Sequence, residues 1–143
     1  MAPYTRNSVL FLAALCLTVV AWFLGNPLWM RAFVLERTFS SGTGWSLTFF
    51  GAIWGYDFLL SLAVGCGLAY FIGSSHRVRW AIAFGTVLCA AHAAFFLPKV
   101  VYASDWSDYV TIHAGLVVPL VGAALGGRLA AWLRSKERRD VVA

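Results

Sequence analysis

The sequence predicts an all-α integral membrane protein, a bundle of four transmembrane helices in one domain covering residues 1–143. Three observations predict this fold class. Hydrophobic residues make up 61% of the chain and charged residues 12%, whereas soluble domains average roughly 45–50% and about 25%. The apolar residues occur in four long blocks, each long enough for a helix to cross the bilayer hydrocarbon. None of the blocks alternates with period two, which argues against membrane-spanning strands.

Each of the four blocks, at residues 8–25, 46–72, 80–98 and 109–133, is predicted to form one span. The first block follows Arg6 and so also resembles the apolar region of a signal peptide. No small-x-small cleavage pattern follows it, and we therefore expect a helix that stays in the membrane. The second block is longer than a span requires, which favours a helix that tilts or protrudes from the bilayer.

The first outer loop is predicted to contain a short interfacial helix. Asn26 can cap a helix and Pro27 is favoured at the first helical position, so a new helix is expected to begin there. Residues 28–39 are rich in large apolar side chains but also carry charged ones. That composition suits a helix lying at the membrane surface better than one crossing it. Residues 40–44 are typical of a turn.

The distribution of basic residues predicts the orientation of the chain. Most of the 11 Lys and Arg residues fall before the first span, between the second and third spans, or at the C-terminal end. Basic residues concentrate on the cytoplasmic side of membrane proteins. We therefore expect both termini in the cytoplasm, with the chain in a bacterial inner membrane. The same rule explains the net charge of +5, so we expect the lipid bilayer, and no nucleic acid, as a partner.

Three ionisable residues lie inside the predicted spans, away from their basic ends: Asp57, His92 and His113. A charged side chain in a span costs about 2.5–3.5 kcal/mol on insertion scales and usually faces a bundle interior or a cavity. Counted at 1.5 Å per residue from the cytoplasmic ends of their helices, all three lie about 20–24 Å deep. We therefore predict one polar layer in the outer half of the membrane.

Neighbouring residues extend this predicted site. Ser61 lies one turn after Asp57, on the same face of the second span. Tyr109 lies one turn before His113, and together with Asp108 it is expected at the outer mouth of the site.

Four interpretations of the polar layer stay open. Asp57 and the histidines can form a network that binds a proton, a cation or a small polar ligand. Two histidines and a carboxylate are also a common ligand set for a metal ion, although helical motifs such as HxxxH are absent. His92 and His113, at matching depth, can hold haem b. In the fourth interpretation, Asp57 and a histidine only form a hydrogen bond that locks the bundle.

Glycines mark the faces where helices are expected to pack closely. They occur at helical spacing in the second and fourth spans: Gly51, Gly55, Gly115, Gly122 and Gly126. Such faces serve packing within one chain, or assembly with a second copy or with a larger membrane complex.

The function predicted from these features is binding or translocation of a proton, a cation or a small polar ligand. One alternative is a non-catalytic accessory or assembly subunit of a larger membrane complex. A further alternative is a haem b-binding electron-transfer protein. The motifs of serine hydrolases, zinc proteases and phosphate-binding loops do not occur, so an enzymatic function is left open but is not favoured.

Overall fold

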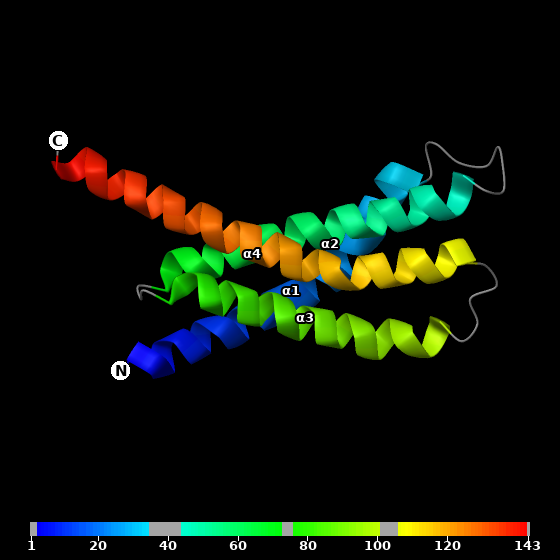
Figure 1. Cartoon of the computed structure of the whole chain (residues 1–143), viewed down its shortest axis with the longest axis horizontal. Coiled ribbons are helices and arrows are strands. Elements are labelled where there is room, and N and C mark those ends of the chain that lie inside the picture. The colour runs from blue at the N-terminus through cyan, green and yellow to red at the C-terminus, as the bar shows by residue number, and fades with distance from the viewer. Residues whose placement is uncertain (1–2, 35–43, 73–75, 101–105, 143) are drawn as a thin grey trace.

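The computed structural model describes residues 3–34, 44–72, 76–100 and 106–142. These residues form four helices: α1 (Pro3–Val34), α2 (Gly44–Phe71), α3 (Arg77–Val100) and α4 (Trp106–Val142). The helices lie lengthwise in an elongated bundle (Figure 1). Within the described ranges there is no strand, which confirms the prediction of an all-α fold.

Three helices, counted over the described residues, are long and apolar enough to cross a membrane. The candidate spans are Tyr4–Gly25 in α1, Ile53–Phe71 in α2 and Gly115–Arg139 in α4. They overlap the first, second and fourth blocks predicted from the sequence. α3 covers the third predicted block, residues 80–98, but is not among the three.

The first helix differs from the prediction at Asn26 and Pro27. α1 continues through Pro27 to Val34, so the expectation that a separate helix begins there is wrong. Residues 28–34 of the predicted interfacial helix belong to α1, and residues 35–39 lie outside the described residues. Proline removes only one backbone donor. In an apolar environment, continuing the helix leaves fewer backbone groups without a partner than ending it would.

α2 and α4 form the most extensive helix pair in the bundle, and small residues allow them to approach closely. A side chain at Gly122 of α4 would meet the backbone carbonyl of Phe58 at 2.7 Å, and one at Gly126 would overlap the carbonyl of Leu62. Only glycine permits backbones to come this near to each other. The glycine face of α4 therefore serves packing within the chain.

The other glycines predicted to mark packing faces are less completely described. Gly115 lies against the indole ring of Trp54 on α2. The surroundings of Gly51 lie outside the described residues, and the packing role of Gly55 stays a prediction.

α3 packs on α4 through a second pair of glycines. A side chain at Gly85 of α3 would come within 2.9 Å of the Cα atom of Leu120, and one at Gly127 of α4 within 2.7 Å of Ala81. α4 therefore packs closely against both α2 and α3.

α1 crosses the bundle obliquely, and this path positions the site. Near its start, Phe11 packs edge-on against Trp80 of α3, with ring centroids 5.6 Å apart. Farther along, the hydroxyl of Tyr56 on α2 donates a hydrogen bond of 2.5 Å to the carbonyl of Ala21. α1 thus leans on α3 at one end and on α2 at the other (Figure 1).

Candidate functional site

Asp57 is a buried acid in the apolar part of α2. It lies four residues inside the end of the candidate span Ile53–Phe71, and only 6% of it is exposed. The indole Nε1–H of Trp22 on α1 donates a hydrogen bond of 3.0 Å to its Oδ1 atom. One carboxyl oxygen is therefore held by a neighbouring helix.

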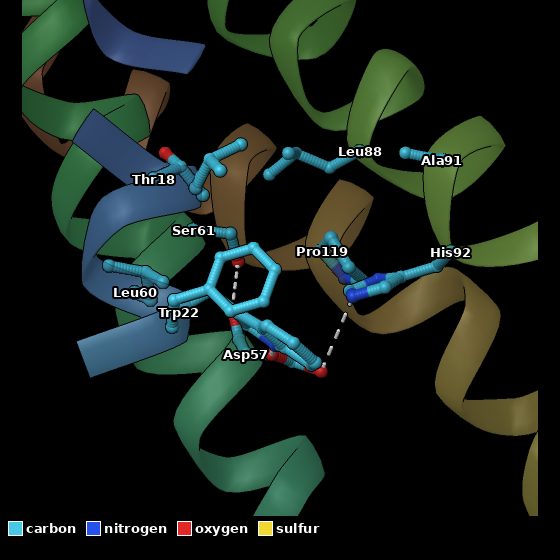
Figure 2. A pocket seen from close by; sticks show the side chains of 11 residues that line it. Thr18, Trp22, Asp57, Leu60, Ser61, Leu88, Ala91, His92 and Pro119 are labelled. Atoms are coloured by element: carbon cyan, nitrogen blue, oxygen red, sulfur yellow. Dashed lines mark hydrogen bonds and ion pairs between the residues drawn. The ribbon is translucent and has the colours of Figure 1, made fainter. Parts of the chain in front are cut away.

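His92 of α3 faces the other oxygen of the same carboxyl group. Its Nε2 atom lies 3.8 Å from Oδ2 of Asp57, which forms an ion pair when the imidazole is protonated. This separation exceeds the length of a hydrogen bond. Trp22 and His92 therefore reach Asp57 from two different helices (Figure 2), and the structure brings together two of the three ionisable residues predicted to share a layer.

Ser61 lies one turn from Asp57 and is 1% exposed. Its hydroxyl contacts the backbone carbonyls of its own helix, at 2.6 Å from Asp57 O and 3.0 Å from Phe58 O. The residue faces inward, as its spacing predicts. Because a hydroxyl has one proton to donate, these backbone contacts engage its donor.

A pocket of about 190 Å³ lies beside the Asp57–His92 pair, between α1 and α3. Most of its wall is aliphatic or aromatic. Asp57 and His92 lie together at one end, whereas Thr18 lies toward the other end (Figure 2). All four helices contribute to the lining: Thr18, Val19, Trp22, Phe23, Asp57, Leu60, Ser61, Leu88, Ala91, His92 and Pro119.

The pocket opens on the side of the bundle. Val19 and Phe23 of α1 are 52% and 67% exposed, and Ala91 of α3 is also exposed. These three residues form the rim on the face where α1 and α3 separate. The Asp57 carboxyl lies deeper, among buried residues. A molecule in contact with this side of the bundle therefore has a path to the acid.

The remaining predicted site residues belong to the first turns of α4. His113, Tyr109 and Asp108 lie within the helix, but their side chains are outside the described residues. His113 is six residues, about 9 Å along the helix, from the pocket residue Pro119. Its membership of the polar layer stays a prediction, and so does haem ligation by His92 and His113.

Two side chains that can act as metal ligands, the Asp57 carboxyl and the His92 imidazole, face each other at the site. Among the described residues no third His, Cys, Asp or Glu joins them to form a group able to hold a metal ion. Either side chain can bind a proton, and at this distance the charge of one affects proton binding by the other. The Asp57 carboxyl can also accept a hydrogen-bond donor, because Oδ2 keeps acceptor capacity beyond the Trp22 bond to Oδ1.

Trp22 is the residue of the candidate site that reasoning from the sequence missed. It lies 16 residues after Arg6, and Asp57 lies 16 residues before Gly73, so the same depth count places both at one level. A buried indole N–H usually needs a hydrogen-bond partner. A tryptophan at the depth of a buried acid was therefore a usable signal.

Comparison with known proteins gives no match: no protein-family model, no curated protein and no solved structure is similar to the chain. The chemistry of the site therefore rests on its own residues.

Proposed function

We propose that the chain is a four-span protein of a bacterial inner membrane, with α3 as the additional span and both termini in the cytoplasm. Support comes from the arrangement of the helix ends. The start of α1, the end of α2, the start of α3 and the end of α4 gather at one end of the bundle (Figure 1). Most of the Lys and Arg residues lie near these four helix ends, as the rule for cytoplasmic segments requires.

The proposed function is binding or translocation of a proton, a cation or a small polar ligand at Asp57 and His92. The observation that carries this proposal is the position of the pair, with its two side chains 3.8 Å apart at the polar end of a pocket. Ionisable side chains inside a membrane are costly, and those that persist commonly mark sites for protons or ligands. If the contact between the two side chains only stabilised the fold, it would not require an adjoining pocket.

The alternative function, an accessory subunit, receives less support from the packing. Exposed glycine faces would favour assembly with other chains. Gly122 and Gly126 instead pack against α2, and Gly85 packs against α4. These glycine faces are therefore used inside the chain.

The proton is the smallest ligand of the proposed site, and its binding can be observed directly. The protein, labelled with carbon-13 at the Asp carboxyl carbons, is placed in lipid nanodiscs, and the Asp57→Asn variant assigns the Asp57 signal. Spectra are recorded from about pH 2.5 to about pH 9, a range that brackets the ordinary pKa values of both groups. We expect the Asp57 signal to titrate and its midpoint to move in the His92→Gln variant, because the two groups are coupled.

Asp140 provides an internal control for this titration. It lies 21 residues, about 30 Å along α4, beyond the pocket residue Pro119. Its signal should not respond to His92→Gln. An Asp57 signal that stays constant over the whole range, or that titrates identically with and without His92, would contradict the proposal and leave the structural interpretation.

A further inference from the structure

We infer that the ligand of this site is a lipophilic amine, an organic cation whose ammonium group binds Oδ2 of Asp57 and whose apolar body fills the pocket between α1 and α3. The inference rests on the proposed function and names the chemical class of its ligand. Four properties of the site lead to it: its acceptor, its charge, its size and its entrance.

The acceptor is the outer oxygen of the Asp57 carboxyl group. Oδ1 already accepts the bond from Trp22, whereas Oδ2 is 3.8 Å from the nearest imidazole nitrogen of His92, beyond hydrogen-bond length. The polar end of the pocket therefore offers an oxygen that can accept a further N–H or O–H. It suits a ligand whose head group donates.

The charge of the site favours a cation among such donors. Among the described residues that line the pocket there is neither Lys nor Arg, and His92 is the one that can carry a positive charge. An ionised carboxyl in an apolar environment is stabilised by a directly paired positive group. An ammonium head supplies that charge together with the donor. Fatty acids and phospholipid phosphates carry a negative charge, so an ionised Asp57 would repel them.

The size of the pocket limits the body of the ligand. A cavity of about 150 Å³ accommodates benzene, and this pocket has about 190 Å³. A short alkyl chain therefore fits beside the carboxyl group, and a ring at its other end can lie at the open rim. Leu60, Leu88 and Phe23 supply apolar walls. The Trp22 ring, already bonded to Asp57, offers a face that attracts cations.

The entrance of the pocket selects ligands that dissolve in the bilayer. The rim residues Val19, Phe23 and Ala91 are exposed on the side of the bundle. In the proposed topology this side faces lipid. A molecule that reaches Asp57 by this path must first partition into the membrane, and lipophilic amines do so because their apolar body offsets the cost of the head group.

Three probes with the same body test the inference. Phenylbutylamine, phenylbutanol and phenylbutyrate share a phenylbutyl skeleton and differ in the polar group at its end. Their binding is measured by calorimetry on the wild-type protein in nanodiscs, with empty nanodiscs as the control for partitioning. We expect the amine to bind at least about tenfold more tightly than the alcohol, because hydrogen bonds to charged groups are the stronger class. Phenylbutyrate is expected not to bind above the empty-disc control.

Substitutions then locate the recognition. Asp57→Asn should lower the affinity for phenylbutylamine by about tenfold or more while changing the affinity for phenylbutanol little. Gly67→Ala is the matched control on the same helix, because it lies outside the pocket lining and a side chain there meets no atom within 4 Å. It should leave the affinities for both probes unchanged.

The outcomes separate this inference from the proposed function. Equal binding of amine and alcohol to the wild-type protein, or no binding of the amine, would overturn the inference even where Asp57→Asn does not fold. If the midpoint of the Asp57 titration nevertheless depends on His92, the proposed function is retained and only the amine inference fails. If the signal does not titrate and the amine does not bind, both fail.

Discussion

Replacing Gly65 by alanine is expected to destabilise the bundle, whereas the same replacement at Gly67 is not. Both glycines lie on α2, two residues apart. A Cβ atom at Gly65 would lie 2.8 Å from the Cα atom and 2.9 Å from the carbonyl oxygen of Ala123 on α4. A Cβ atom at Gly67 would meet nothing within 4 Å.

The expected difference can be estimated from these distances. Ordinary Cβ contacts begin near 3.4 Å, and backbone atoms cannot rotate away as side chains do. α2 and α4 must therefore move apart where Gly65 contacts Ala123, and overpacking of this kind costs about 1–3 kcal/mol. Both variants gain the same helix propensity, up to about 1 kcal/mol for each Gly→Ala change. That gain cancels in the comparison, so the free energy of unfolding should differ by about 1–3 kcal/mol.

The assay is reversible unfolding in mixed micelles, in which the fraction of a denaturing detergent is raised and helicity is followed by circular dichroism. Gly65→Ala should unfold at a lower detergent fraction than Gly67→Ala, and Gly67→Ala should be at least as stable as the wild type. Equal unfolding of the two variants would refute the close crossing of α2 and α4 on which the position of Asp57 depends.

Two further substitutions test the contacts that hold the bundle around the site, by the same unfolding assay. Tyr56→Phe removes the hydrogen bond to the carbonyl of Ala21 and should cost about 0.5–1.5 kcal/mol; an unchanged unfolding midpoint would mean that this bond does not hold α1 on α2. Arg134→Gln removes a charge-assisted hydrogen bond of 2.6 Å to the carbonyl of Tyr70, near the C-terminal end of α2. It also removes the contact of the guanidinium group with the Tyr70 ring. It should cost about 2 kcal/mol, with Arg134→Lys intermediate, and equal stability of the two variants would count against the ring contact.

The proximity of Asp57 and His92 was predictable because the two residues lie on consecutive antiparallel helices. Residues at similar distances from a short connection come to the same level of a hairpin, and α2 ends at Phe71 only a few residues before α3 begins at Arg77. Counting from the connection therefore predicts a shared level. It does not give the distance of 3.8 Å, because that depends on how each helix is rotated about its axis.

The pocket itself was beyond prediction from the sequence. It exists because α1 leans on α3 through Phe11 and on α2 through Tyr56. α1 carries apolar residues on most of its faces, so its composition does not reveal which neighbouring helix each turn will contact. The continuation of α1 past Pro27 escaped prediction for a related reason. Local preferences favour a helix start at Asn26 and Pro27, whereas the surrounding structure decides whether the helix continues.

A bulky side chain at the rim should separate the roles of the pocket and of the acid. Ala91 of α3 lines the pocket and is exposed, so a larger residue there can fold without disturbing the core. Because about 150 Å³ accommodates benzene, the ring of Ala91→Phe would fill most of the space of about 190 Å³. Binding of phenylbutylamine and phenylbutanol should then fall together, by about tenfold or more, whereas Asp57→Asn lowers the affinity for the amine alone. If calorimetry shows that Ala91→Phe weakens neither probe, the ligand does not lie between α1 and α3, even where its amine still depends on Asp57.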